Sequence, residues 1–179
     1  DIIAGMRWAA GLAVPGIPAN PNPAQIINLS LAGAGTCSAA YISAIAEIRA
    51  TGTLIVAAAG NETGPVDEPA NCAGVLAVAG IRHAGTKVGY SSYGVEVGIS
   101  APAGNCVNTT VGLPCLFPFI NTINLGSTVP AGNGYTGIGD TTVGTSYATP
   151  LVAGTAALML AANPALSETG LTRYIKQGA

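Results

Sequence analysis

The stretch GTSYATPLVAG, from Gly144 to Gly154, places one serine at the threshold of an apolar helix. Gly144 permits a tight bend, and Thr145 and Ser146 favour the first positions of a helix, where side-chain oxygens meet unpaired backbone N–H groups. The helix dipole and these N–H groups point at the Ser146 hydroxyl and can stabilise negative charge on a substrate carbonyl. Ser146 is therefore a candidate nucleophile, and capping of a core helix is the alternative role.

Pro150 and the residues after it predict where this helix lies. Proline is compatible with a first helical turn and poor in an interior, so we expect the helix to begin just before Pro150. Almost every residue from Leu151 to Ala162 is apolar, which predicts a helix buried on all sides. The run is shorter than the ~20 residues that a bilayer span needs, so we expect no membrane segment.

The elements that must position Ser146 indicate an α/β fold. Short apolar runs typical of parallel strands covered on both faces occupy residues 26–31, 53–59, 75–81 and 97–101. We expect helices at residues 1–13, at 38–49 with Gly52 as the C-cap, after Gly144, and at 167–176. Strand–helix alternation predicts a mostly parallel sheet with helices on both faces and right-handed crossovers.

The sequence also predicts which helix faces point inward and where the long loops lie. The helix at 1–13 should turn Ile2, Ile3, Met6 and Ala9 or Ala10 to one face, and the helix at 38–49 should turn Ile42, Ile45, Ala46 and Ile48 inward. Glycine and proline mark residues 15–23 as a surface loop. Residues 102–139 are rich in Gly, Pro, Asn and Thr and predict long loops with a hairpin that pairs 118–122 with 123–129.

Composition limits the classes of function. A chain of 179 residues suits one domain, and 49% hydrophobic with 8% charged residues requires a surface built from small polar residues. The net charge is −2 and the 6 basic residues are not clustered, which argues against nucleic-acid and membrane partners.

The four cysteines indicate an oxidising, extracellular compartment. They allow three disulfide connectivities, among which we favour Cys37–Cys72 and Cys106–Cys115, because the second closes a local loop. A zinc site is the competing interpretation, and it lacks both a C-x-x-C spacing and a nearby histidine.

Three collinear stretches resemble the subtilisin-like serine proteases. GTSYATPLVAGTAALML is similar to the family's serine motif, LIVAAAGNETG at 54–64 to its oxyanion motif, and QIINLSLAG at 25–33 to the strand that lines its substrate cleft. The resemblance implies a three-layer α/β domain and a secreted serine endopeptidase that acts through an acyl-enzyme. It assigns the nucleophile to Ser146 and the oxyanion hole to Asn61 and the Ser146 backbone N–H.

The resemblance also implies a pocket for the residue before the scissile bond. One wall is Ser30, Leu31 and Ala32, the opposite wall is Ala58, Ala59 and Gly60, and the substrate backbone pairs along the edge as an added strand. Asp67 and Glu68 fall at the family's pocket floor, where a carboxylate can pair with Lys or Arg. In a proline-rich loop such residues are also typical of a solvated surface. Tyr147 replaces the methionine that usually follows the nucleophile, which leaves acyl transfer intact.

The family's Asp-Thr/Ser-Gly and His-Gly-Thr-His motifs do not occur here, and the single histidine, His83, matches a surface turn. We therefore expect residues 1–179 to be the C-terminal part of a protease catalytic domain, incomplete at the N-terminus and inactive alone. Its partners would be protein or peptide substrates, the N-terminal half of the same domain and a propeptide. The chemistry requires no cofactor, and structural calcium is compatible with it. The alternative is a protease-like module that binds or supports without catalysis.

Overall fold

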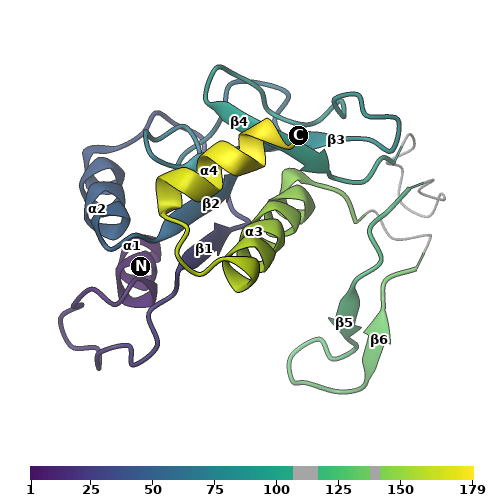
Figure 1. The fold of residues 1–179 in the computed structure, drawn as a ribbon. Coiled ribbons are helices and arrows are strands. Elements are labelled where there is room, and N and C mark those ends of the chain that lie inside the picture. The colour runs from purple at the N-terminus through teal and green to yellow at the C-terminus, as the bar shows by residue number, and fades with distance from the viewer. Residues whose placement is uncertain (107–116, 138–141) are drawn as a thin grey trace.

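The fold is centred on a sheet of four parallel strands. The computed structural model describes residues 1–106, 117–137 and 142–179. In spatial order the strands are β1 (Ile26–Leu29), β2 (Leu54–Ala58), β3 (Leu76–Ile81) and β4 (Val97–Pro102) (Figure 1). β2 is inside the sheet and buried along its whole length, whereas β1 lies at an edge. The four strands predicted from the apolar runs are confirmed.

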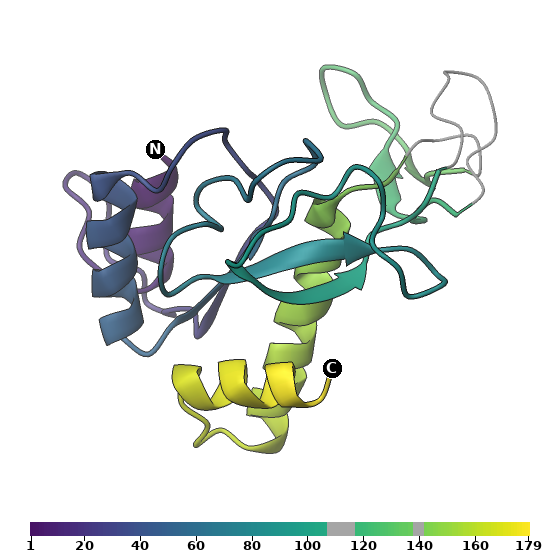
Figure 2. The ribbon, with the colours of Figure 1, turned by 90° about the horizontal axis from the view of Figure 1, so that it is seen from above.

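Two pairs of helices cover the two faces of the sheet. α1 (Ile2–Ala9) and α2 (Ala39–Ala50) pack together on one face. α3 (Thr145–Ala162) and α4 (Glu168–Gln177) pack on the other face, so the strands lie between the two pairs (Figure 2). The predicted α/β class with helices on both faces is confirmed.

The alternation of side chains along β2 divides the core into two halves. Ile55 and Ala57 point to one face and join the core formed with α1 and α2. Leu54 and Val56 point to the other face and join the core formed with α3 and α4. Both faces of the strand are therefore apolar, which explains why its sequence reads as an unbroken apolar run.

The predicted helix faces were wrong in part. α1 ends at Ala9, because Gly11 adopts a φ of +82° soon after it, and Ile2 is exposed. In α2 Ile42 is 57% exposed and Ala46 is exposed as well. The residues of α2 that are buried are Tyr41, Ala44, Ile45 and Ile48.

α3 begins earlier than predicted and is not buried on all sides. Its first residue is Thr145, so Pro150 lies inside the helix. Val152 and Ala156 are buried against the sheet, whose four strands α3 contacts, whereas Leu158 is 74% exposed. By length and composition α3 could span a membrane, but its contact with every strand of the sheet is that of a core helix in an α/β domain.

A hairpin projects from the body between β4 and α3 (Figure 1). β5 (Thr122–Asn124) pairs antiparallel with β6 (Asn133–Tyr135), so the predicted pairing of 118–122 with 123–129 was wrong. The Asn124 side chain sets this register, because its Oδ1 accepts hydrogen bonds from Gly126 N–H and Ala131 N–H, both at 2.9 Å. The residues between the strands therefore form a turn rather than a second strand.

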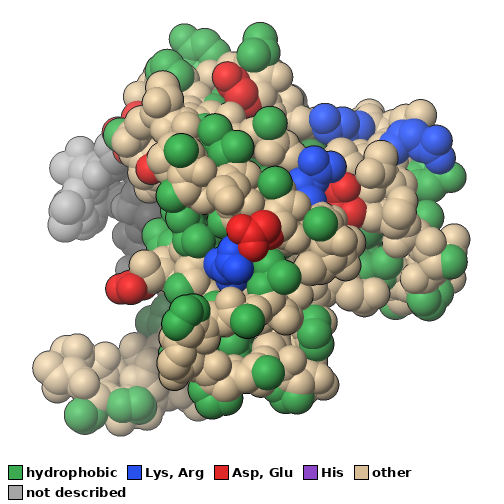
Figure 3. Space-filling model, turned by 90° about the vertical axis from the view of Figure 1, so that its left-hand side faces the viewer, with side chains coloured by type: hydrophobic (Ala, Val, Ile, Leu, Met, Phe, Trp, Pro, Cys, Tyr) green, Lys and Arg blue, Asp and Glu red, His purple; other side chains and the backbone are tan. Residues whose placement is uncertain are grey.

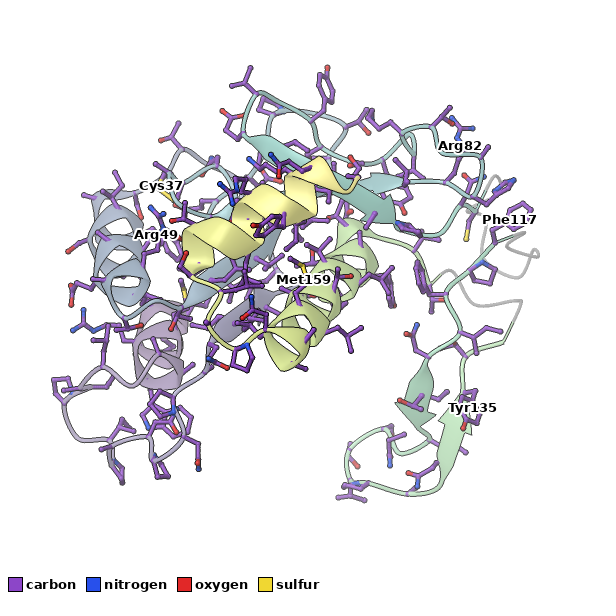
Figure 4. The ribbon with its side chains drawn as sticks, in the orientation of Figure 1. Cys37, Arg49, Arg82, Phe117, Tyr135 and Met159 are labelled. Atoms are coloured by element: carbon purple, nitrogen blue, oxygen red, sulfur yellow. A yellow bond between two sulfur atoms is a disulfide. The ribbon has the colours of Figure 1, made fainter. Side chains whose placement is uncertain are left out.

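Covalent and ionic links join the elements of the body. Cys37 and Cys72 form the predicted disulfide, with a Cα–Cα distance of 5.1 Å, and Arg49 of α2 pairs with Glu168 of α4 at 3.1 Å (Figure 4). The second predicted pair, Cys106–Cys115, lies outside the described residues. On the face shown in Figure 3, basic side chains gather toward the upper right, whereas acidic side chains lie singly across the face.

Candidate active site

Ser146 lies in the first turn of α3, near the carboxyl ends of the parallel strands. Gly144 precedes the helix with a φ of 154°, and its N–H donates to the carbonyl of Ala103, just after β4, at 2.9 Å. The Ser146 N–H belongs to the first helical turn, whose amides have no intrahelical acceptor. Within the described residues the Thr145 N–H donates to the Asn61 Oδ1 and the Tyr147 N–H donates to the Gly144 carbonyl, so of these three amides the Ser146 N–H is the one left to bind a substrate carbonyl that gains negative charge.

Ser146 and Ser30 exchange hydrogen bonds. The Ser146 Oγ donates to the Ser30 carbonyl at 3.1 Å, and the Ser30 Oγ donates to the Ser146 carbonyl at 2.8 Å. In an ordinary helix the Ser146 carbonyl would accept from the N–H four residues later, but that residue is Pro150, which has none. The interior position of Pro150 therefore leaves the Ser146 carbonyl available to the segment that follows β1.

The Asn61 side chain is held at the start of α3 by Thr145, the residue before Ser146. Its Oδ1 accepts two hydrogen bonds from Thr145, one from the N–H at 2.9 Å and one from the Oγ1 at 3.1 Å. A carbonyl oxygen is the only part of the amide that can accept these bonds, so the NH₂ group must point the other way. Asn61 is exposed, and its NH₂ group has no hydrogen-bond partner among the described residues. This leaves a fixed donor facing solvent next to the serine.

Thr145 is the site residue that sequence reasoning did not single out, except as a helix cap. It is fully buried, and its Oγ1 also lies 3.3 Å from both the N–H and the carbonyl oxygen of Gly60. It thus joins α3 to the end of β2 and orients the Asn61 amide. Its place directly before Ser146 was the only signal in the sequence.

The two predicted pocket walls lie at the carboxyl ends of neighbouring strands, as expected for an α/β sheet. Ser30, Leu31 and Ala32 follow β1, where Leu31 is half-buried and the other two are exposed. On the opposite side are Ala58, Ala59 and Gly60, which are all buried at the end of β2. Both walls contact the start of α3, the first through Ser146 and the second through Thr145.

The structure separates the two acidic residues that were predicted at the pocket floor. Asp67 lies against Gly60, since a Cβ added to this glycine would be 2.1 Å from the Asp67 Oδ2. Glu68 instead accepts the N–H of Ser38 at the start of α2, at 3.2 Å, and burial together with the Glu68 charge raises the pKa of Tyr41. Only Asp67 therefore borders the pocket wall, whereas Glu68 belongs to the α2 side.

The pocket loops are tied to one another. Gly33 and Glu68 exchange backbone hydrogen bonds of 2.8 Å and 3.0 Å, and the Asn71 Nδ2 donates to the Gly35 carbonyl at 2.7 Å. The disulfide between Cys37 and Cys72 closes the same pair of loops. The loop after β1 and the loop after β2 therefore form one connected rim.

His83 does not reach the candidate nucleophile through any contact. It follows β3, is exposed, and stacks on Phe117 with ring centroids 3.8 Å apart. It is the only histidine of the chain. The Ser146 proton therefore faces the Ser30 carbonyl and has no imidazole to accept it.

Aromatic side chains lie on the side of the site that faces the segment after β4. Tyr147 stacks on Phe119, with ring centroids 5.3 Å apart and planes at 8°. Tyr90 lies with its hydroxyl 2.5 Å from the Ala103 carbonyl and 3.1 Å from that of Gly104, and burial raises its pKa to about 12. These contacts fix the segment after β4 against the start of α3.

Known proteins resemble this chain along its whole length. An extracellular protease of Xanthomonas campestris pv. campestris is 39% identical over 182 residues, which cover 100% of this chain and 28% of that protein. An extracellular basic protease of Dichelobacter nodosus is 36% identical over 171 residues, 94% of this chain and 26% of that protein. The solved structure of a protease from Pseudoalteromonas arctica matches 98% of this chain and 50% of its own, with a TM-score of 0.88 and 38% identity.

The chain thus spans about a quarter of the length of these two relatives and half of this solved chain. The subtilase peptidase family matches residues 1–179 without a break. Its match covers the sheet, both helix layers and the Ser146–Asn61 arrangement together, and we conclude that this chain belongs to the subtilase family.

Proposed function

We propose that this chain is part of a serine endopeptidase in which Ser146 attacks the scissile carbonyl. The Ser146 Oγ forms a bond to the carbonyl carbon while its proton passes to a base, the base gives this proton to the leaving amine as the C–N bond breaks, and water later hydrolyses the acyl-enzyme. The Asn61 NH₂ and the Ser146 N–H would bind the oxyanion of each tetrahedral intermediate. The observation that carries this proposal is the orientation of Asn61, whose oxygen is held by Thr145 while its NH₂ group stays free.

The base and its orienting carboxylate would come from the rest of the protein. The chain covers only 50% of the Pseudoalteromonas arctica protease chain, and within the described residues β1 is an edge strand of the sheet. His83 is engaged with Phe117 and does not contact Ser146. We therefore infer that residues 1–179 alone are inactive and that an N-terminal part supplies the Asp and the His.

The two pocket walls indicate how a peptide substrate would lie. A peptide would lie across the strand ends, with the side chain before the scissile bond between Ser30–Ala32 and Ala58–Gly60. Asp67 borders this pocket at Gly60, so we propose a preference for Lys or Arg at that substrate position. We do not extend this proposal to Glu68, because its carboxylate accepts the Ser38 N–H on the α2 side.

The names of relatives and the disulfide bear on the compartment in which the enzyme acts. The names of two relatives state that those proteases are extracellular, and the Cys37–Cys72 disulfide suits an oxidising compartment, so we propose secretion. Family membership is the sole support for a propeptide partner. Among the described residues, no group of three or more His, Cys, Asp or Glu side chains is placed to hold a metal.

A fluorophosphonate that reacts only with activated serines tests the proposal. The full-length protein should be labelled at Ser146, the Ser146→Ala variant should not be labelled, and residues 1–179 alone should not be labelled either. Asn61→Ala should lower turnover of a peptide anilide by about 100- to 1000-fold. A full-length protein that stays unlabelled, or that retains its activity in Ser146→Ala, would contradict the proposal.

A further inference from the structure

An apolar hollow lies beyond the aromatic side chains of the candidate site. It has a volume of about 170 Å³, below the about 300–1,000 Å³ of sites for drug-sized ligands, so it is suited to a single side chain. Among the described residues, no acidic side chain, lysine or arginine lines it. The lining side chains come from the ends of β3 and β4 and from the segment before β5: Ile81, His83, Pro102, Phe117, Pro118 and Phe119.

The wall of this hollow is held in place by contacts on both sides. The Phe117 carbonyl accepts the N–H of Asn105 at 2.9 Å, and the Phe119 N–H donates to the carbonyl of Thr142 at 2.8 Å. The His83 ring stacks on Phe117 at 3.8 Å. Figure 4 shows Phe117 at the same end of the molecule as Arg82, which follows β3. The hollow is therefore a formed part of the fold.

A stacked pair of aromatic rings lies between the hollow and the candidate active site. Phe119 lines the hollow and also stacks on Tyr147, the residue directly after Ser146. One aromatic pair thus separates the hollow from the nucleophile. An apolar side chain that moves from water into the hollow would be buried beside this aromatic pair. The removal of its apolar surface from water favours binding.

The position of the hollow indicates that the leaving half of a substrate, after the scissile bond, could reach it. The walls proposed for the acyl side lie at the ends of β1 and β2, and Ser30 contacts Ser146 from that side. The hollow lies at the ends of β3 and β4, since Phe117 pairs with Asn105, just after β4. The two halves of an extended peptide leave the scissile bond in opposite directions. A peptide whose acyl half lies over β1 and β2 therefore directs its leaving half toward the hollow.

We propose that this hollow binds an apolar side chain of the substrate within the first three residues after the scissile bond. The inference rests on the proposed function, because it places the peptide by the roles of Ser146 and the two walls. The amine half departs when the C–N bond breaks, so the hollow acts on formation of the acyl-enzyme and not on its hydrolysis. Substrates whose leaving group carries no amino-acid side chain do not use it.

Peptides that differ only after the scissile bond test this inference on the full-length protein. The peptides are internally quenched, share one acyl half and carry Leu, Phe, Gly or Asp at each of the first three leaving-group positions. At one of these positions Leu or Phe should raise kcat/KM over Gly by about tenfold, within the range for one apolar side chain in a pocket. Phe117→Ala, which removes one wall, should abolish most of this preference.

Ile120→Ala is the matched control, because Ile120 is an exposed apolar residue of the same segment that does not line the hollow. A peptide anilide with the same acyl half should be hydrolysed equally by the wild type and both variants, which also shows that they fold. If the anilide is hydrolysed but no apolar preference appears, or Phe117→Ala and Ile120→Ala behave alike, the hollow is not a substrate site and the proposed function stands. If the anilide is not hydrolysed and Ser146 is not labelled, both proposals are wrong.

Discussion

Replacing Thr145 with valine removes one hydroxyl from behind the candidate oxyanion hole and keeps the shape of the side chain. The Asn61 Oδ1 would keep the Thr145 N–H at 2.9 Å and lose the Oγ1 at 3.1 Å. One such hydrogen bond contributes about 1 kcal/mol, which corresponds to about a fivefold loss in kcat if Asn61 must be oriented in the transition state. The KM of a peptide anilide should stay unchanged, because Thr145 is fully buried and cannot contact the substrate.

The same substitution has a separate effect on stability. The buried Gly60 N–H would lose the Thr145 Oγ1, its acceptor at 3.3 Å, so the free energy of unfolding should fall by about 1–3 kcal/mol. Thr145→Ser keeps the hydroxyl and is the control for both effects. The assays are steady-state hydrolysis and denaturant unfolding of the full-length protein. A kcat equal to that of the wild type would refute the view that Thr145 orients Asn61, and so would a loss as large as the one caused by Asn61→Ala.

Three further outcomes follow from the structure. Asp67→Asn should reduce the advantage of Lys and Arg over Leu before the scissile bond, measured with anilides, and an unchanged ratio would remove Asp67 from the pocket. Replacing Cys37 and Cys72 with serine opens a link between residues 35 positions apart and should lower the free energy of unfolding by about 4 kcal/mol in the chain-entropy treatment. The unfolded state releases the Tyr90 proton near pH 10 and the folded state near 12, so stability should fall as pH rises through this window. Comparing unfolding midpoints of the wild type and Tyr90→Phe from pH 9 to 12 isolates this loss, which the variant should lack.

The sheet could be predicted from the sequence because its inner strands, β2 and β3, are buried on both faces. β2 alternates Leu54 and Val56 toward one core with Ile55 and Ala57 toward the other, so no polar residue interrupts the run. Glycine and alanine at its end, followed by Asn61, indicated the carboxyl edge where the site lies. The Cys37–Cys72 pair was also predicted, whereas its role in joining the two pocket loops needed the structure.

The parts that sequence reasoning missed depend on contacts between distant segments. α2 is apolar almost all round, so its sequence did not distinguish Ile42, which is exposed, from Tyr41, which is buried. The register of the hairpin depends on the bonds of one Asn124 side chain. The role of Thr145 depends on a partner 84 positions away in the chain. Local patterns carry none of this information.

Pro150 changes the contacts that hold the nucleophile, because it has no N–H to bond the Ser146 carbonyl. Most residues near a helix start move with the helix, because hydrogen bonds along its axis hold them. Here the Ser146 carbonyl is bonded to Ser30 instead, so the reacting turn is coupled to the segment after β1. The nucleophile is thus held by the wall of the substrate cleft as well as by its own helix, and a displacement of the segment after β1 would be felt directly at the Ser146 backbone.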